Sequence, residues 1–220
     1  MVSSAPTVPT TIAAESLSKA FSGAPLFKDL SFSASSGLVA IAGRNGSGKT
    51  TLLKILAGLA RPTTGRVRLE TDGVPPLSVS ERRLAVGWAG PDLALYGEFT
   101  AVENLAFFRR AAGRPTPEEE LVRRLADVGL AEEAMRRRVE EYSTGMKQRL
   151  RIAFATLFDP PVLILDEPMV ALDLDGRDTV YRVIETARRR GTVLLASNDE
   201  RDFAEPEQRV ELAGARRREA

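Results

Sequence analysis

The sequence predicts an α/β fold, in which short strands alternate with helices around a largely parallel sheet. Compact apolar runs of strand length occur at Leu38–Ala42, Val162–Leu165 and Thr192–Ala196. Helical spacing of apolar residues follows the first run over Lys49–Gly58, and it lies between the other two over Asp175–Arg190. This alternation is typical of parallel sheets, because a helix is the usual connection between two parallel strands.

The composition fits a globular chain and excludes several kinds of chemistry. The chain has 220 residues, of which 43% are hydrophobic and 28% charged, so it can bury the core of one domain with a subdomain. Lysine and arginine number 31, aspartate and glutamate 30, and this balance argues against a nucleic-acid partner. With no cysteine and no histidine, disulfides, zinc–thiolate sites and acid–base catalysis by histidine are excluded.

The two ends of the chain differ from the part between them. Residues 1–10 are rich in Ser, Thr and Pro and lack the basic start and apolar centre of a signal peptide, so we expect a disordered tail. We place the folded domain at residues 11–213 and a frayed tail at residues 214–220. No apolar run approaches the roughly 20 residues that a membrane-spanning helix needs.

The remaining elements follow in chain order. Short strand-type segments are expected at Thr11–Leu17, Leu30–Ala34, Val67–Thr71 and Leu84–Trp88. From residue 101 to residue 138 the apolar spacing is helical, with breaks at a glycine and two prolines. A long helix is then expected over Tyr142–Phe158. The stretch from about residue 92 to residue 158 therefore predicts a helical subdomain inserted between strands.

The segment GRNGSGKT, Gly43–Thr50, matches the pattern G-x-x-x-x-G-K-[ST] of a phosphate-binding loop. It follows a predicted strand and opens a predicted helix, and this context distinguishes it from a chance glycine-rich turn. Backbone N–H groups and a helix N-terminus attract phosphate, Lys49 can reach the β- and γ-phosphates, and the Thr50 hydroxyl can bind Mg²⁺. The nucleotide-binding residues predicted here are Gly43, Arg44, Asn45, Gly46, Ser47, Gly48, Lys49, Thr50 and Thr51.

A second motif, VLILDEP at Val162–Pro168, ends a predicted strand with two carboxylates. Asp166 at the carboxyl end of the strand is placed to hold Mg²⁺ through water. Glu167 is placed to polarise an attacking water molecule. An exposed turn is the alternative for any Asp-Glu pair, but the apolar strand and the upstream phosphate loop favour a metal and catalytic role.

The order of these motifs, with three further segments, resembles the ATP-binding subunits of ABC transporters. A signature-like stretch at Ser143–Gln148 precedes LDEP, ALD follows at Ala171–Asp173, and LSKAF precedes the phosphate loop. The resemblance covers about residues 11 to 213. It implies a P-loop NTPase core with a mixed or parallel sheet, an N-terminal antiparallel β subdomain and the inserted α-helical subdomain.

The resemblance also implies a shared site between two subunits. Ser143, Thr144, Gly145 and Met146 match the signature loop, which in the family faces the γ-phosphate bound by the other subunit. Here Thr stands where the family usually has Gly, and Met where it often has Gln. Asp173 matches the loop that crosses between subunits. A homodimer of ATPase subunits, with ATP at the interface, is therefore implied.

The family is next compared at the position of Phe21 and at the position near Pro91. Phe21 matches the aromatic residue that stacks on adenine, although an apolar residue at a strand end is an alternative for a lone Phe. The family carries a Gln that senses Mg²⁺, water and the membrane partner near the position of Pro91, and no Gln lies there. Asp92 is the candidate to replace it through a carboxylate oxygen.

The strand at Thr192–Ala196 ends in Ser197, Asn198 and Asp199. The family usually has a His at the position of Asn198, which contacts the γ-phosphate. An Asn amide can donate a hydrogen bond to phosphate but cannot shuttle a proton. The alternative is a local helix cap, since Asn and Asp favour such positions. We expect Glu167, Asn198 and Lys49 to be the catalytic residues.

The resemblance implies an ATP- and Mg²⁺-dependent ATPase on the cytoplasmic, inner face of the cell membrane, powering a separate membrane-spanning permease. The segment LALYGEFTAVENLAFF and the signature resemble the short haem-exporter subunits of cytochrome c biogenesis. Two alternatives stay open. One is a regulatory subunit with weak hydrolysis, which the missing Gln and His favour. The other is an ABC ATPase without a transport role.

Overall fold

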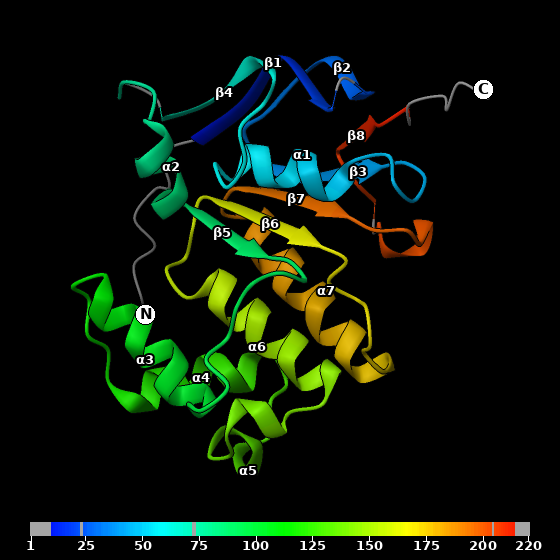
Figure 1. Ribbon diagram of the computed structural model, residues 1–220. Coiled ribbons are helices and arrows are strands. Elements are labelled where there is room, and N and C mark those ends of the chain that lie inside the picture. Colours follow the sequence, from blue (N-terminus) through cyan, green and yellow to red (C-terminus); the bar gives the residue numbers. More distant parts are fainter. Residues whose placement is uncertain (1–9, 23, 72–73, 204, 214–220) are drawn as a thin grey trace.

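The computed structural model describes residues 10–22, 24–71, 74–203 and 205–213. It contains two sheets, one antiparallel and one parallel, with helices packed against both faces of the parallel sheet (Figure 1). This arrangement confirms the predicted α/β fold with an N-terminal antiparallel part. Residues 1–9 and 214–220 of the two predicted tails lie outside the described residues.

The antiparallel sheet has the strand order β2-β1-β4, with β1 (Thr10–Phe21) in the centre. Its neighbours are β2 (Ala24–Ala34) and β4 (Thr64–Thr71). All three strands are longer than predicted, because the pairing of β1 continues through several register shifts. Thr10 begins β1, so the prediction that the disordered tail includes residue 10 was wrong.

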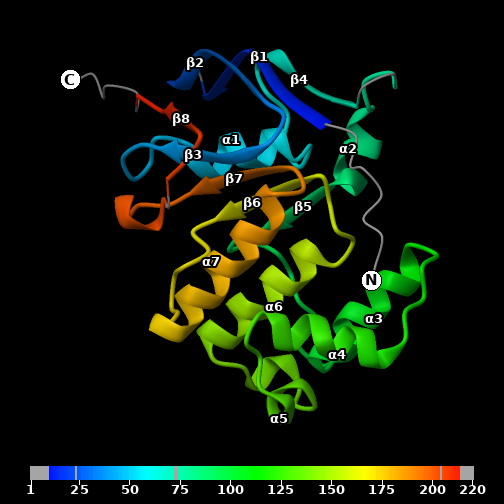
Figure 2. The same ribbon diagram turned by 180° about the vertical axis from the view of Figure 1, so that it is seen from behind.

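The parallel sheet has the strand order β5-β6-β7-β3-β8 (Figure 2). The five strands are β3 (Gly37–Ala42), β5 (Val86–Ala89), β6 (Val162–Asp166), β7 (Thr192–Ala196) and β8 (Gln208–Glu211). Every pairing within this sheet is parallel, so all five carboxyl ends lie at the same edge. The site described below lies at that edge.

Alternate residues of the parallel strands face two hydrophobic cores. One core combines residues such as Ile41 and Ile164 with helix α1 (Lys49–Leu56) and the antiparallel sheet. The other combines residues such as Leu163 and Leu195 with the helices on the opposite face. Helix α1 is thus packed between the two sheets (Figure 1). Burial on both faces explains why these strands are continuous apolar runs in the sequence.

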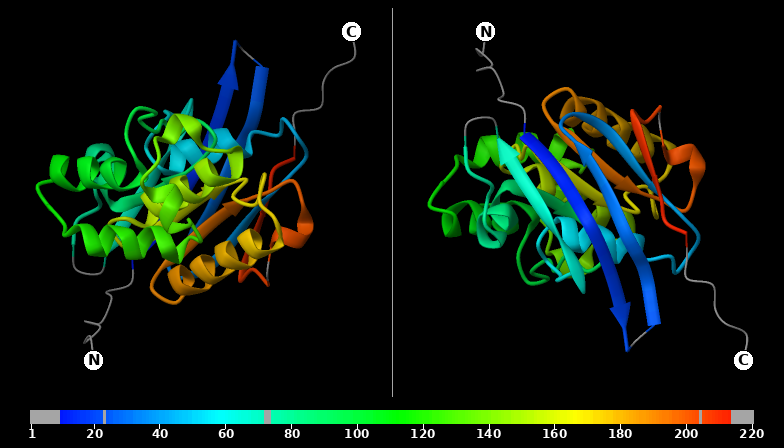
Figure 3. Two further views of the ribbon diagram at one scale, coloured as in Figure 1. Left: turned by 90° about the horizontal axis from the view of Figure 1, so that it is seen from below. Right: turned by 90° about the horizontal axis from the view of Figure 1, so that it is seen from above.

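The remaining helices lie mainly on the other face of the parallel sheet, with the β1–β2 hairpin end projecting past the core (Figure 3). Between β5 and β6 the chain forms α3 (Ala101–Ala111), α4 (Glu118–Asp127), α5 (Glu132–Met135), the 3-10 helix η1 (Val139–Glu141) and α6 (Thr144–Thr156). Helix α7 (Leu174–Arg188) follows β6, and the 3-10 helix η2 (Glu200–Asp202) follows β7. Among the helices that the structure describes, none combines sufficient length with sufficient apolar character to span a bilayer.

The sequence prediction misplaced one strand and missed one α-helix, one strand and the two 3-10 helices. The strand expected at Leu84–Trp88 is β5, Val86–Ala89, because Leu84 belongs to helix α2 (Val79–Ala85) and is 84% exposed. Helix α2 was not expected, although its capping box of Ser78 and Glu81 is visible in the sequence. Strand β8 was also missed, because its four residues contain a single buried apolar side chain.

Candidate nucleotide-binding site

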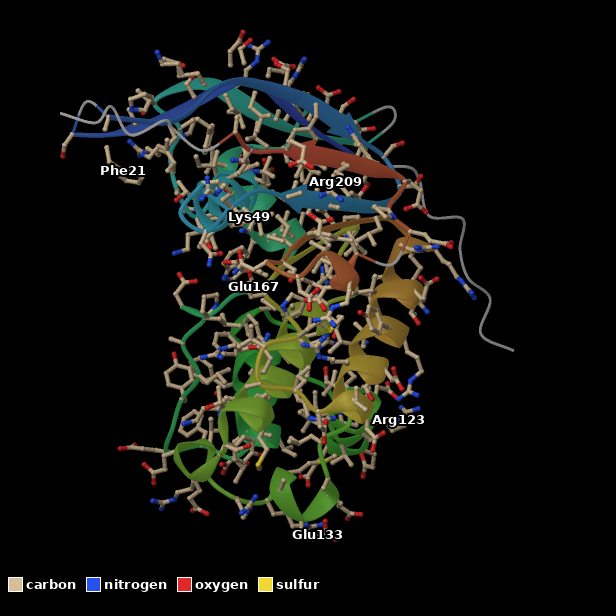
Figure 4. The ribbon with its side chains drawn as sticks, turned by 90° about the vertical axis from the view of Figure 1, so that its right-hand side faces the viewer. Phe21, Lys49, Arg123, Glu133, Glu167 and Arg209 are labelled. Atoms are coloured by element: carbon tan, nitrogen blue, oxygen red, sulfur yellow. The ribbon has the colours of Figure 1, made fainter. Side chains whose placement is uncertain are left out.

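The carboxyl ends of β3, β6 and β7 bring together three segments that are far apart in the sequence. These are the phosphate loop after β3, the Asp166–Glu167 pair at the end of β6, and Ser197–Asn198 after β7. Lys49 and Glu167 lie on the same side of the molecule in Figure 4, between the antiparallel sheet and the helical part. The parallel sheet order places these segments on neighbouring strands.

The phosphate loop leads directly into helix α1 without a side-chain cap. Gly48 is the N-cap residue and has a left-handed backbone, with φ of 100°, which favours glycine. A Cβ atom on Gly43 would lie 2.6 Å from the Ser47 hydroxyl oxygen, so the loop has no room for a side chain there. The Ser47 hydroxyl is buried and has no hydrogen-bond partner among the described residues. The first turn of α1 therefore keeps backbone N–H groups that an anion can bind.

Lys49 is buried and aims its ammonium group back into this loop. Its Nζ donates to the Gly43 carbonyl at 2.9 Å and to Asn198 Oδ1 at 2.7 Å. Both acceptors are neutral, so neither of them offsets the ammonium charge. Lys49 therefore provides a cation at the centre of the site, and a phosphate oxygen can take the place of Asn198 as its acceptor.

Asp166 is 2% exposed, and neither of its carboxylate oxygens has a hydrogen-bond partner among the described residues. Burial raises the pKa of this carboxyl above its ordinary value, and the Thr50 hydroxyl and the Lys49 ammonium oppose that effect only in part. An unpaired buried carboxylate is costly unless a cation or a donor joins it. The group is therefore suited to bind a metal ion.

Glu167 is the residue after β6 and has a left-handed backbone, with φ of 53°. Its backbone N–H donates to the Ala196 carbonyl at 2.8 Å, which ties the end of β6 to the end of β7. Burial raises the pKa of the Glu167 carboxyl, and the backbone N–H of Asn198 and the Lys49 ammonium oppose this effect. A half-buried carboxylate with a raised pKa is a better proton acceptor than an exposed one.

Asn198 is exposed, and its side chain faces the phosphate loop through the hydrogen bond from Lys49. The local caps are made by its neighbours instead. The Ser197 hydroxyl accepts from the Asp199 N–H at 3.0 Å, and the Asp199 carboxylate accepts from the Arg201 N–H at 3.0 Å. The local hydrogen bonds of the described residues therefore assign capping to Ser197 and Asp199 rather than to the Asn198 side chain.

Other predicted residues lie away from this cluster. Phe21 is 56% exposed at the end of β1, with Lys19 Nζ 4.8 Å from its ring centre (Figure 4). Ser143 is the N-cap of α6, and its hydroxyl accepts from the Met146 N–H at 3.2 Å. Among the described residues, no hydrogen bond or ion pair joins Ser143–Met146 to the phosphate loop of the same chain. The turn Ser143–Met146 is therefore not bonded to the phosphate loop, whereas Gln148 of the same helix donates to the Glu167 and Pro168 carbonyls at 3.4 and 3.2 Å.

The profile of the ABC transporter family matches residues 27–170, which include the phosphate loop, the first turn of α6 and the Asp166–Glu167 pair. The chain belongs to the ABC transporter family.

Two curated relatives illustrate the range of matches. An uncharacterized ABC transporter ATP-binding protein of Bacillus subtilis is 38% identical over 187 residues, which are 84% of this chain and 61% of that protein. A sulfate/thiosulfate import ATP-binding protein of Mesorhizobium japonicum is 35% identical over 201 residues, which are 87% of this chain and 57% of that protein. The chain thus spans less than two thirds of the length of these relatives.

The fold is also that of a solved ABC cassette. The ATP-binding cassette MJ0796, in a dimeric post-hydrolysis state bound to ADP and Pi, has a TM-score of 0.79 to this chain. The match covers 91% of this chain and 94% of that chain at 22% identity. It supports the P-loop core with antiparallel and helical parts.

In this ABC family member, helix α6 is bonded to the loop that follows β6. Arg149 of α6 contacts the Asp173 carboxylate at 3.0 Å, and Asp173 caps α7 by accepting from the Gly176 N–H at 2.9 Å. A Cβ atom on Gly145 would lie 2.7 Å from the Ala171 carbonyl oxygen. The first turn of α6 and the loop Ala171–Asp173 therefore form one packed surface.

Asp92, the candidate replacement for the missing Gln, forms an ion pair with Lys54 of α1 at 2.9 Å. The charge of Asp92 is a minor influence that raises the pKa of Asp166, after the larger effect of burial. Pro91 itself is exposed and has no polar side chain. Pro91, near which the family resemblance leads us to expect a Gln, is thus followed by a carboxylate that is paired with a lysine.

Two residues near the site, Asp202 and Arg177, were not singled out from the sequence. The Ser197 hydroxyl donates to Asp202 Oδ2 at 2.6 Å, and Asp202 Oδ1 pairs with Arg177 of α7 at 3.2 Å. Asp202 is 3% exposed, although it lies in a polar stretch of the sequence. No local pattern distinguishes a buried Asp in a polar run, so only the three-dimensional structure could find this cluster.

Proposed function

We propose that this chain is the ATP-binding and ATP-hydrolysing subunit of an ABC transporter, and that it powers a separate membrane-spanning permease. The observation that carries the proposal is the convergence of the uncapped α1, Lys49, Asp166 and Glu167 at one edge of the sheet. Each group suits one part of ATP: phosphate oxygens, the metal bound to them, and the attacking water. Family membership supports the same assignment.

Magnesium fits the residues at this edge. The two Asp166 oxygens are buried without a partner among the described residues, and the Thr50 hydroxyl lies close enough to influence the pKa of that carboxyl. Hard oxygen ligands of this kind are what Mg²⁺ prefers, with phosphate and water completing the set. Thr50 and Asp166 would hold the ion, which neutralises phosphate charge when bound.

In the proposed reaction, water attacks the γ-phosphoryl group of ATP and ADP leaves. Glu167 accepts the proton of the attacking water, and its raised pKa suits that task. Lys49 holds the β- and γ-phosphates, and Asn198 donates an amide hydrogen to the γ-phosphate once the Lys49 contact is exchanged. Such reactions depend mainly on positioning and charge stabilisation.

Two copies of the chain complete each site in this proposal. Ser143, Thr144, Gly145 and Met146 lie at the start of α6, where no acidic residue stands in the first turn. This helix end suits the γ-phosphate held by the other subunit, with Phe21 against the adenine. Asp173 and the exposed Leu174 lie on the adjoining surface. The dimeric state of the solved MJ0796 cassette is consistent with this arrangement.

The permease is proposed to dock beside the segment that follows β5. A cavity of about 490 Å³ there is lined by Leu93, Leu95, Gly97 and Lys147, among others. Phe108 packs on Phe154 with ring centres 4.4 Å apart and belongs to the core, whereas Tyr96 and Phe107 are 45% and 41% exposed. Docking there would keep the chain at the inner face of the membrane. Nucleic acid is not a proposed partner.

Docking can be tested with Tyr96→Glu, which adds a charge to this exposed surface. We expect loss of permease capture in a pull-down, with ATP affinity unchanged. Val79→Glu, on the exposed face of α2, is the matched control because it adds the same charge elsewhere. Equal capture by both variants would exclude the Tyr96 surface.

We propose a haem-like cargo, in a cytochrome c biogenesis system, because two segments resemble that branch. The curated relatives include a sulfate/thiosulfate import protein, so the family itself leaves cargo and direction open. Co-expression with the permease, followed by haem transport assays in vesicles, tests the cargo. Transport of another substrate but not haem would exclude it.

The ATPase assignment is tested with Glu167→Gln. We expect ATP binding to persist and steady-state phosphate release to fall by about 10²-fold or more, because an amide cannot accept the proton. The variant should accumulate as a dimer with ATP. Unchanged turnover would remove Glu167 from this role. If the wild-type chain itself binds ATP with negligible turnover, the regulatory alternative applies, which Asn198 in place of His favours.

A further inference from the structure

A small buried polar cluster lies beneath the turn that carries Asn198. Ser197 and Asp202 are each 3% exposed, yet both have polar side chains. The cluster is outside the residues assigned above to ATP, Mg²⁺ or water. Buried polar groups are costly unless they are bonded, so the bonds they make indicate what the cluster holds in place.

The Ser197 hydroxyl stands between two carboxylates. It donates to Asp202 Oδ2 at 2.6 Å, and its oxygen lies 3.5 Å from Glu167 Oε2. A hydroxyl has a single hydrogen, so the shorter contact determines its direction. Asp202 therefore orients Ser197, and Ser197 in turn sets one side of the space around the Glu167 carboxylate.

Helix α7 holds Asp202 from the other side. Arg177 Nη1 pairs with Asp202 Oδ1 at 3.2 Å, and the Tyr181 hydroxyl donates to the Arg201 carbonyl at 3.1 Å. Both residues come from α7, the helix that Asp173 caps. The turn from Ser197 to Asp202 is thus clamped to a rigid helix at two points.

The position of this turn determines the geometry of the candidate site. Asn198 directly follows Ser197 and accepts from Lys49 at 2.7 Å. Glu167 is bonded through its N–H to the Ala196 carbonyl, one residue before Ser197. A shift of Ser197 would therefore move both the Asn198 amide and the surroundings of the Glu167 carboxylate.

We propose that Asp202 is a positioning residue for ATP hydrolysis: through Ser197, and held by Arg177, it fixes the turn that aims Asn198 and Glu167 at the nucleotide. The proposal rests on the function proposed above. Asp202 touches neither nucleotide nor water in this arrangement, so its effect is on the rate of the chemical step. A displacement of about 1 Å at reacting groups can lower a rate by about 10²-fold.

The test uses the 220-residue chain with Ser197→Ala, Asp202→Asn and Asp202→Ala. Steady-state kcat and KM for ATP, and the melting temperature, are measured for each variant. Ser197→Ala should lower kcat by about ten- to a hundredfold, with KM changed little, because binding by Lys49 is retained. The Asn side chain has one acceptor oxygen and can bond to only one of Ser197 and Arg177. The kcat of Asp202→Asn should therefore lie between those of the wild type and Asp202→Ala.

Thr179→Val is the matched control for loss of a buried polar contact on the same helix. The Thr179 hydroxyl donates to the Asp175 carbonyl at 2.8 Å and accepts from Arg182, and neither of these bonds involves Ser197. We expect this variant to lower the melting temperature and leave kcat per folded molecule unchanged. If Ser197→Ala and Asp202→Asn behave in the same way, the cluster is merely structural and the proposal is wrong.

Glu167→Gln separates failure of this inference from failure of the proposed function. If Glu167→Gln abolishes turnover while Ser197→Ala keeps the wild-type kcat, only the positioning role is excluded. If Glu167→Gln keeps wild-type turnover, the proposed base is wrong and the positioning proposal fails with it. Should Asp202→Ala fail to fold, Ser197→Ala still decides the question, since the Arg177–Asp202 pair remains.

Discussion

The N-terminus of helix α1 has no side-chain cap, whereas the N-termini of helices α2 and α3 are closed by capping boxes. Helix α2 starts with a capping box, in which the Ser78 N–H donates to Glu81 Oε2 at 2.8 Å and the Glu81 N–H donates back to the Ser78 hydroxyl. Helix α3 repeats this with Thr100 and Glu103. Helix α1 has a glycine N-cap, no side-chain cap and no acidic residue in its first turn. Its positive end is therefore left for a ligand.

Helix α6 is intermediate between these two kinds of start. Ser143 caps it with one hydrogen bond, but its first turn has no acidic residue. Among the helices that the structure describes, α1 and α6 alone lack an acidic residue in the first turn. The two helix ends proposed to face phosphate therefore share the lack of an acidic residue in the first turn. They do not share the lack of a side-chain cap.

The largest effect is expected when the cation at the open helix end is removed. Lys49→Ala should weaken ATP binding by about 10²-fold, because charge-assisted bonds to phosphate contribute roughly 1.5–3 kcal/mol each. Isothermal titration calorimetry measures the affinity, and Lys28→Ala, an exposed lysine of β2, is the control. Undiminished affinity in a folded Lys49→Ala variant would show that phosphate is held elsewhere.

Asn198→Ala tests whether the Asn198 amide, which accepts a hydrogen bond from Lys49, takes part in ATP hydrolysis. If the amide donates to the γ-phosphate, kcat should fall by about ten- to a hundredfold, since one donor to a charged oxygen is worth roughly 1.5–3 kcal/mol. The melting temperature should change little, because Ser197 and Asp199 make the local caps. A lower melting temperature with normal kcat would instead assign Asn198 a structural role. Asn198→His should be tolerated, since both side chains are planar and of similar reach.

Thr51→Glu places an acidic residue in the first turn of α1, as in α2. We expect ATP affinity to fall by about 5- to 30-fold, because a carboxylate beside the phosphates costs roughly 1–2 kcal/mol in a partly buried first turn. The nucleotide-free protein should become slightly more stable. Val79→Glu, in the first turn of α2, should give a similar gain in stability with no change in affinity. Equal affinities for both variants would remove the first turn of α1 from the site.

The smallest effect is expected from removal of the serine N-caps of α6 and α2. Ser143→Ala and Ser78→Ala each remove one cap and should each lower the free energy of unfolding by about 1 kcal/mol. Only Ser143→Ala should also weaken ATP-dependent dimerisation, measured by sedimentation velocity with the Glu167→Gln background. Identical dimerisation in both variants would exclude Ser143 from the interface between subunits.

The strongly patterned parts of this fold could be predicted from the sequence. The strands β3, β6 and β7 are buried on both faces, so their apolar runs are unmistakable, and the phosphate loop has fixed residues at fixed spacing. Helix α2 was hidden because its exposed Val79 and Leu84 break the expected amphipathic pattern. Here tertiary context, rather than local propensity, decided where the helix ended and β5 began.

The candidate site was predicted residue by residue, but its internal contacts were not. The sequence indicates that Lys49, Asp166 and Glu167 meet, because the phosphate loop and the Asp-Glu pair each stand at the carboxyl end of a predicted parallel strand. It contains no sign of the bond between Lys49 and Asn198, or of the Ser197–Asp202 cluster. Such contacts depend on side-chain directions at two distant segments, which no periodicity encodes. The roles of these residues in ATP chemistry stay predictions.

The strand order of the parallel sheet has a consequence for how the chain folds during synthesis. Strand β3 is buried at all six positions, and its neighbours are β7 and β8, the last two strands of the described chain. Gly37 pairs with Thr192, so the strand that precedes the phosphate loop leaves the ribosome long before either partner exists. Until then β3 has two unpaired edges and two apolar faces, and exposed strands of this kind are prone to aggregate. We therefore expect a nascent chain that halts before β7 to expose this strand, even though its phosphate loop is already complete.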